Sequence, residues 1–183
     1  FESDGKEQAD NFIATVPKLE NTLPPVIDIE IYDGETVPDA KTARTEIQEM
    51  ADALEAYYGV KPILYTNPST YMDYLMGHRW GYAVWMSNPY CEPIVDWTFW
   101  QYSFEGDLQG FAQEHIPVDL NVYNGSRKQF LKQFSLQEIS NWPNKNVRNR
   151  FLSESGKISS RRIYPMKYYI GIDLGGTNIV AGV

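Results

Sequence analysis

Short apolar segments that alternate with helix-forming stretches are the feature that most constrains the fold of this chain. Five segments have the length and composition of buried strands, at 26–30, 62–65, 82–86, 98–102 and 118–123. Four other segments are predicted to be helical, over 6–16, 38–58, 68–75 and 126–134. Strands separated by helices return to the same edge of a sheet and pair in parallel, so the alternation predicts an α/β fold. The last strands lose their intervening helices, which argues against a regular eightfold repeat.

The charge and the composition exclude several classes of partner. The chain has 183 residues, a net charge of -8 and an isoelectric point of about 4.8. Nucleic-acid binders need a basic surface that replaces counterions, and membrane surfaces attract polybasic segments. No apolar run approaches the roughly 18 residues of a membrane span. Cys91 is the only cysteine, and His78 and His115 stand isolated, so we expect no disulfide, metal, nucleic-acid or membrane partner.

Two acidic residues interrupt the first apolar strand. Asp28 and Glu30 are two residues apart, so both point to the same side, while Ile27 and Ile29 point to the other. Two carboxylates held together repel each other, and burial should raise one of the two pKa values. A carboxyl group that keeps its proton near neutral pH can donate it to a leaving glycosidic oxygen. The alternative is that both carboxylates only bind backbone amides or an arginine.

Other polar and aromatic residues lie on the later strands. Asp119 shares one side of its strand with Asn121, either as a site residue or as part of a polar face open to solvent. Four aromatic residues can stack on sugar rings or pack in the core, namely Tyr65, Trp85, Trp100 and Tyr102. Trp100 and Tyr102 point to one side of their strand, and Gln101 points to the other.

Six segments together carry a resemblance to a known family. They are 8–12 (QADNF), 23–30 (LPPVIDIE), 61–66 (KPILYT), 82–85 (YAVW), 100–103 (WQYS) and 118–121 (VDLN). In this order they resemble glycoside hydrolase family 25, the muramidases that include bacterial autolysins and phage endolysins. The resemblance runs from residue 1 to about residue 134, and the ordered series is more specific than any single segment.

The resemblance implies an activity and a set of site residues. Family members hydrolyse the β-1,4 bond between N-acetylmuramic acid and N-acetylglucosamine in peptidoglycan, at the cell wall or outside the cell. Glu30 matches the general acid, and Asp28 and Asp119 match acidic residues that stabilise positive charge while the substrate's acetamido group assists. The residues expected to bind substrate are Tyr65, Trp85, Trp100, Gln101, Tyr102 and Asn121. No metal or cofactor is implied, and we expect a monomer whose partner is the peptidoglycan glycan strand.

The resemblance also implies a TIM-like (β/α) barrel that is incomplete at its N-terminus. Family members begin with a strand that carries another active-site aspartate, followed by two more strands, and all three are expected before Phe1. A barrel that lacks three strands cannot close and exposes unpaired edges. We therefore expect the 183-residue polypeptide to be inactive or unstable by itself. An alternative function is that of a non-catalytic peptidoglycan-binding module.

The C-terminal part of the chain has a different character. Residues 1–134 are predicted to be the catalytic barrel, and the polar, basic segment 135–165 is predicted to be a linker or a disordered tail. Residues 166–183 resemble the start of a ROK-family sugar kinase, whose Asp-Leu-Gly-Gly-Thr-Asn turn is a phosphate loop. The alternative is an ordinary β-hairpin. A second alternative function is therefore a fragment of a sugar kinase, without kinase activity because the catalytic residues would lie beyond Val183.

Overall fold

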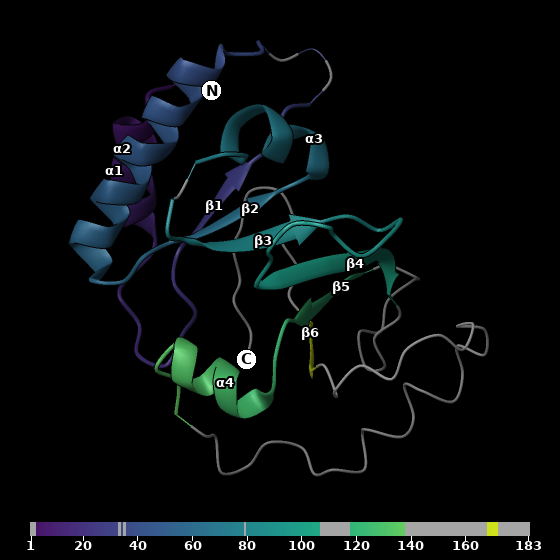
Figure 1. Cartoon of the computed structure of the whole chain (residues 1–183). Coiled ribbons are helices and arrows are strands. Elements are labelled where there is room, and N and C mark those ends of the chain that lie inside the picture. Colours follow the sequence, from purple (N-terminus) through teal and green to yellow (C-terminus); the bar gives the residue numbers. More distant parts are fainter. Residues whose placement is uncertain are drawn as a thin grey trace.

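A computed structural model describes residues 3–32, 34, 36–78, 80–106, 118–137 and 168–171, the last four as backbone only. Its centre is a six-stranded sheet in the order β1-β2-β3-β4-β5-β6 (Figure 1). The strands are β1 (Val26–Ile29), β2 (Ile63–Thr66), β3 (Ala83–Ser87), β4 (Phe99–Gly106), β5 (Val118–Tyr123) and β6 (Tyr168–Gly171). The helices are α1 (Gly5–Thr15), α2 (Ala40–Tyr58), α3 (Pro68–Thr70), the π-helical turn η1 (Tyr71–Leu75) and α4 (Arg127–Gln133).

The sheet has a parallel part and an antiparallel part. Strands β1 to β4 pair in parallel, which confirms the prediction for the first four strands. Strand β5 runs antiparallel to β4, and β6 runs antiparallel to β5. The pairing of β4 with β5 shifts register between Gln101 and Ser103 and again before Gly106. The fold is α/β with a mainly parallel sheet, which is compatible with an incomplete β/α barrel.

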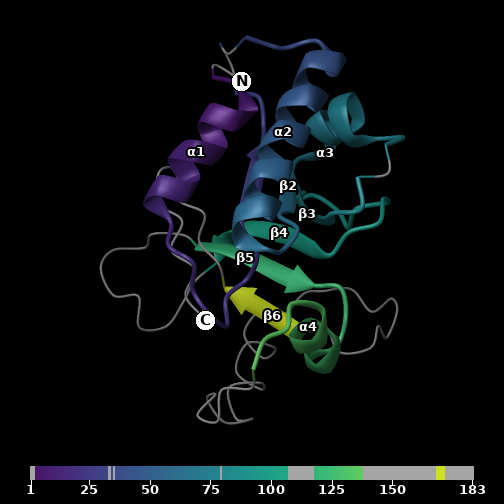
Figure 2. The same cartoon turned by 90° about the vertical axis from the view of Figure 1, so that its left-hand side faces the viewer.

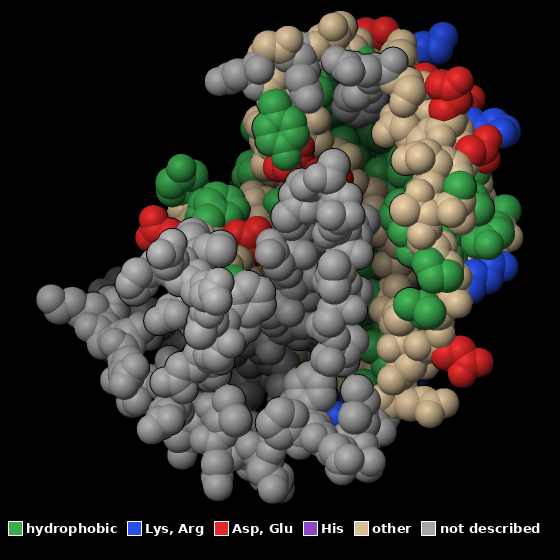
Figure 3. Space-filling model, turned by 180° about the vertical axis from the view of Figure 1, so that it is seen from behind, with side chains coloured by type: hydrophobic (Ala, Val, Ile, Leu, Met, Phe, Trp, Pro, Cys, Tyr) green, Lys and Arg blue, Asp and Glu red, His purple; other side chains and the backbone are tan. Residues whose placement is uncertain are grey.

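Helices α1 and α2 lie side by side and cover one face of the sheet (Figure 2). Asp39 caps the start of α2 by accepting hydrogen bonds from the amides of Lys41 and Thr42. Gly59, with φ of 77°, ends α2 in the left-handed conformation. The outer surface of the two helices carries side chains of both charges (Figure 3). In α2, the apolar positions that recur at helical spacing lie on the buried side, and the charged positions lie on the exposed side.

Gly5 lets α1 approach α2 closely. Its amide donates a hydrogen bond to the Glu46 carboxylate, and a Cβ atom at position 5 would collide with the Glu46 backbone. Any larger residue there must push the two helices apart. The contact fixes how α1 sits on the helix layer, and the sequence pattern alone did not predict it.

Helix α4 packs against the opposite face of the sheet from α1 and α2. Its Phe130 and Phe134 contact Phe99 of β4 and Tyr123 of β5. A capping box at Ser126 and Gln129 sets the start of the helix. The predicted helix over 126–134 is thus confirmed, and it closes one end of this face with aromatic rings.

One helical segment of the chain differs from its expected form. The segment expected as one helix over 68–75 contains the wider turn η1, in which the Met76 amide bonds to the Tyr71 carbonyl. Strand β6 pairs with β5, whereas most of the predicted linker and the glycine-rich turn of the kinase-like segment lie outside the described residues, as does His115. Among the described helices, none has the length and apolar character needed to cross a membrane.

Candidate active site

The strand register divides the site residues between the two faces of the sheet. Ile27 and Ile29 pack under α1 and α2, which confirms that Asp28 and Glu30 point the other way. We call this second side the carboxylate face. Asp28 lies in register with Tyr65 of β2, and Tyr65 lies in register with Trp85 of β3. The carboxylate face is therefore built from the alternate residues of each strand.

Glu30 follows the C-terminal end of β1 and is half-buried. The Tyr32 hydroxyl donates a hydrogen bond to Glu30 Oε2 at 2.8 Å, and Asn67 Nδ2 donates to Oε1 at 3.3 Å. Asn67 also caps α3, because its Oδ1 accepts hydrogen bonds from Ser69 Oγ and the Thr70 amide. Sequence reasoning missed Tyr32 and Asn67. The Asn67-Pro68 pair is a helix-start signal that could have placed Asn67 at this strand end.

Asp28 is the member of the acidic pair with a raised pKa. Burial, and then the negative charge of Glu30, raise the pKa of Asp28 to about 7. Asp28 is exposed by its accessible surface, yet protein atoms crowd its carboxyl group and weaken its hydration. The sequence predicted that one carboxyl of this pair would hold its proton near neutral pH, and that carboxyl is Asp28.

Asp119 is held from β4 through a buried glutamine. Gln101 Nε2 donates a hydrogen bond to Asp119 Oδ2 at 2.8 Å. Gln101 Oε1 accepts hydrogen bonds from the Tyr65 hydroxyl at 2.7 Å and from Ser87 Oγ at 2.6 Å. Burial raises the pKa of Tyr65, a hydrogen bond with Ser87 opposes this, and the nearby carboxylates add to the rise, so the Tyr65 hydroxyl stays a donor. The sequence did not single out Ser87.

The predicted substrate-binding residues fall into two groups, and neither group presents a solvent-exposed surface on the carboxylate face. Trp100 and Tyr102 lie on the other face, packed with Met86, Trp97 and Val122. The other four lie on the carboxylate face but are buried, with exposed fractions of 7% for Tyr65 and 1% each for Trp85, Gln101 and Asn121. The strand pattern gives the side to which a residue points, but not its depth below the surface.

Trp85 and Asn121 form a second buried pair beside the glutamine. Trp85 Nε1 donates a hydrogen bond to Asn121 Oδ1 at 2.8 Å, and Asn121 Nδ2 bonds to the Asp119 carbonyl at 3.4 Å. Both the side chain and the backbone of Asp119 are thus supported by buried amides. The prediction that Trp85 and Asn121 contact sugar is better replaced by a supporting role, because neither side chain reaches the surface.

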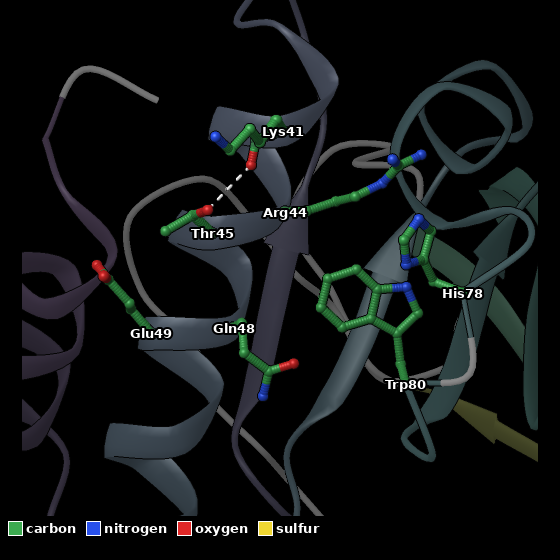
Figure 4. A pocket seen from close by; sticks show the side chains of 7 residues that line it. All are labelled: Lys41, Arg44, Thr45, Gln48, Glu49, His78 and Trp80. Carbon is green, nitrogen blue, oxygen red and sulfur yellow. Dashed lines mark hydrogen bonds between the residues drawn. The ribbon is translucent and has the colours of Figure 1, made fainter.

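A groove on another part of the molecule is not lined by the carboxylates. This groove, of about 530 Å³, lies along α2 and the segment before β3, on the helix side of the sheet (Figure 4). It is lined by Lys41, Arg44, Thr45, Gln48, Glu49, His78 and Trp80. Arg44 donates to the Tyr74 carbonyl, so part of its guanidinium ties α2 to η1. Among the described residues, no group of His, Cys, Asp and Glu has the arrangement of a metal site.

The sequence and the fold are similar to those of known proteins. The sequence model described as glycosyl hydrolases family 25 matches residues 1–111. A family 25 glycosyl hydrolase from Bacillus anthracis is 34% identical, with a TM-score of 0.67 over 72% of this chain and 63% of that one. A bacterial lysozyme from Streptomyces coelicolor is 27% identical, with a TM-score of 0.64 over 72% of this chain and 66% of that one.

A third solved structure is less similar in sequence, and each match covers only part of the two chains. A family GH25 lysozyme from Aspergillus fumigatus, 18% identical with a TM-score of 0.58 over 72% of this chain and 67% of that one, shares the fold. The chain spans slightly less than two thirds of the Bacillus anthracis and Streptomyces coelicolor proteins. No protein with a curated description matches the sequence.

Proposed function

The chain belongs to glycosyl hydrolase family 25, and from this premise we propose that it hydrolyses the β-1,4 bonds between N-acetylmuramic acid and N-acetylglucosamine in peptidoglycan. The observation that carries the proposal is the gathering of Asp28, Glu30 and Asp119 on one face of the sheet. Of these, Asp28 keeps its proton up to a pH of about 7. The similarity to a bacterial lysozyme supports the same reaction.

In this proposal Glu30 is the general acid. It stands at the C-terminal end of a parallel strand, which is the side where β/α barrels place their catalytic groups. It is only half-buried, and two neutral donors orient it. Its proton passes to the leaving oxygen of N-acetylglucosamine while the acetamido oxygen of N-acetylmuramic acid bonds to C1. Water then opens the resulting ring and returns a proton to Glu30, so the anomeric configuration is retained.

Asp28 and Asp119 have a supporting role in the same mechanism. The ring formed by the acetamido group carries a positive charge, and a carboxylate beside it lowers the energy of that state. The negative charge of Glu30 contributes to the raised pKa of Asp28, so Asp119 supplies the stabilising carboxylate while Asp28 is protonated, and Asp28 joins it once ionised. No bound group other than the substrate and water enters these steps.

The proposal extends to partner and location. The substrate is the glycan strand of peptidoglycan, so the protein acts at the cell wall or outside the cell, and it acts as a monomer. Family membership and the lysozyme relatives support the substrate class. Sedimentation of the protein at micromolar concentration measures the monomeric state, and a concentration-dependent dimer would contradict it.

The reaction is tested by the release of reducing ends from purified peptidoglycan. Because the chain spans 63% of the Bacillus anthracis relative, we assay the 183-residue chain and a chimaera that adds the unmatched part of that relative. Glu30→Gln keeps the size of the side chain but removes its acidic proton. We expect the variant to lose activity by roughly 1,000-fold, the scale of a lost general acid.

Glu20→Gln is the matched control, because it makes the same chemical change at an exposed position. It should retain full activity. If Glu30→Gln and Glu20→Gln are equally active, the assignment of the acid is wrong. If no folded form releases reducing ends but the chain still sediments with peptidoglycan, the protein is a binding module instead.

A further inference from the structure

Gln101 joins the parallel and the antiparallel parts of the sheet through polar contacts to three strands. Its side chain is buried in the middle of β4, with an exposed fraction of 1%. Tyr65 reaches it from β2 and Ser87 from β3, both in the parallel part, while Asp119 reaches it from the antiparallel strand β5. A buried amide usually costs stability unless its polar atoms are satisfied. Here both ends of the amide have partners.

The chemistry of these partners fixes the orientation of the amide. A carboxylate offers only acceptors, so the NH₂ end of Gln101 must face Asp119. The carbonyl end then faces the two hydroxyl groups, and each of them must donate to it. Turning the amide over would set its carbonyl oxygen against the carboxylate at about the same short distance of 2.8 Å. The two hydroxyl donors therefore act on Asp119 through Gln101.

We propose that Gln101 is a positioning residue for Asp119, locked in place by the hydroxyl groups of Tyr65 and Ser87. The proposal rests on the proposed function, in which Asp119 supports the reaction. Because Gln101 is buried and its amide is occupied, it does not contact substrate. It holds the Asp119 carboxylate at a fixed place on the carboxylate face, where the carboxyl groups of Asp28 and Glu30 also lie.

A change of Gln101 to glutamate tests the direction of the hydrogen bond. Gln101→Glu keeps the shape and the acceptor for both hydroxyl groups, but it sets a second carboxylate against Asp119. Burial and the charge of Asp119 let the new carboxyl keep its proton, and so act as a donor, until a high pH ionises it and the two charges repel. Gln101→Leu removes the donor at every pH. The titratable groups that share this environment are Asp28, Glu30 and Asp119, together with Tyr65, which stays neutral.

We expect Gln101→Glu to lower kcat about 10- to 100-fold relative to the parent protein at pH 9, the scale of one lost hydrogen bond to a charged group, with KM changed by less than about threefold. At pH 5 the loss relative to the parent protein should shrink at least about fivefold, as the new carboxyl takes up its proton. Gln101→Leu should show the same deficit at both pH values. If Gln101→Glu showed the same deficit at pH 5 as at pH 9, as Gln101→Leu should, the positioning role would be wrong.

A second measurement needs no turnover and uses the 183-residue chain. The side-chain amide of Gln101 is followed by nitrogen-15 NMR, through its exchange with water. The double variant Tyr65→Phe with Ser87→Ala should speed this exchange at least about tenfold, because both donors to the amide are lost. Tyr123→Phe is the control, since the Tyr123 hydroxyl bonds to Gln133 and not to Gln101. Unchanged exchange in the double variant would contradict the lock.

The two measurements separate this proposal from the proposed function. If Glu30→Gln stays active, the assigned reaction is wrong, and the NMR measurement alone decides whether the lock exists. If Glu30→Gln is inactive but Gln101→Glu shows no recovery at pH 5, the reaction stands and only the positioning role fails. The hydroxyl variants keep Gln101 itself, so they still test the lock if a buried carboxylate unfolds the chain.

Discussion

The parallel and the antiparallel parts of the sheet hold their carboxylates in different ways. Glu30 stands at a strand end and receives its hydrogen bonds from Tyr32, which is 61% exposed, and from half-buried Asn67. Asp119 lies on an antiparallel strand and is held by Gln101 and Asn121, which are 1% exposed. Residues on the rim can adjust to a ligand, whereas a buried polar network is rigid once every partner is in place.

The difference indicates a division of labour on the carboxylate face. A proton donor must meet a substrate oxygen that moves during the reaction, and Glu30 is oriented by donors that solvent and substrate can reach. A group that stabilises charge works best when it does not move. The buried network under Asp119 provides that fixed position.

The substitution with the largest expected effect removes the aromatic ring of Phe99, which joins the parallel and the antiparallel parts of the sheet. Phe99 is fully buried and contacts Trp85 of the parallel part and Tyr123 of the antiparallel part. It also contacts Phe130 of α4 and Phe134, which caps that helix. Phe99→Ala should lower the free energy of unfolding by about 3–5 kcal/mol, because it leaves a cavity among aromatic rings. Urea denaturation measures the change.

Phe104→Ala is the control for that measurement, because Phe104 lies on the same strand but is 45% exposed. Its free energy of unfolding should change by less than about 0.5 kcal/mol. Similar effects of the two substitutions would mean that the aromatic cluster does not join the parts of the sheet.

The next test compares a buried hydroxyl with an exposed one. Tyr65→Phe removes a buried donor to Gln101 and should lower the free energy of unfolding by about 1–2 kcal/mol. Tyr32→Phe removes the donor to Glu30 on the rim, where water replaces it, and should change stability by less than about 0.5 kcal/mol. Thermal unfolding of the pair measures the difference, and equal losses would remove the distinction between rim and network.

The smallest effect concerns the raised pKa of Asp28. The folded state holds the proton up to a pH of about 7, against an ordinary value of 3.8, so folded protein binds more protons than unfolded protein between these values. The stabilisation is therefore full below pH 4 and is lost as the pH rises to 7. Relative to the parent protein, Asp28→Asn should gain about 1 kcal/mol by pH 8, a modest value because solvent screens Asp28.

Urea denaturation of both proteins from pH 4 to pH 8 measures this gain. The difference between the two should be small at pH 4 and should reach its plateau above pH 7. Asp73→Asn, at an exposed position on η1, is the control and should show no such trend. A difference that is already complete at pH 4 would show that the proton on Asp28 is not the cause.

Much of the secondary structure could be predicted because its signals are local. The Asp39 cap and Gly59 bound α2, and the strand expected at 118–123 is β5 itself. The sides of Asp28 and Glu30 followed from the two-residue period of a strand. The relative direction of neighbouring strands was harder to predict. The connections β3–β4 and β4–β5 both lack a predicted helix, yet one pair of strands is parallel and the other antiparallel.

By itself, the sequence determined the family, the α/β class and the shared side of the acidic pair. Only the tertiary structure decided that Asp28 carries the raised pKa, that Tyr32 and Asn67 orient Glu30, and that Gln101 lies buried beneath Asp119. It also moved Trp100 and Tyr102 to the other face. The reason is physical: periodicity depends on neighbours within the chain, whereas depth, hydration and hydrogen-bond partners depend on segments that only folding brings together.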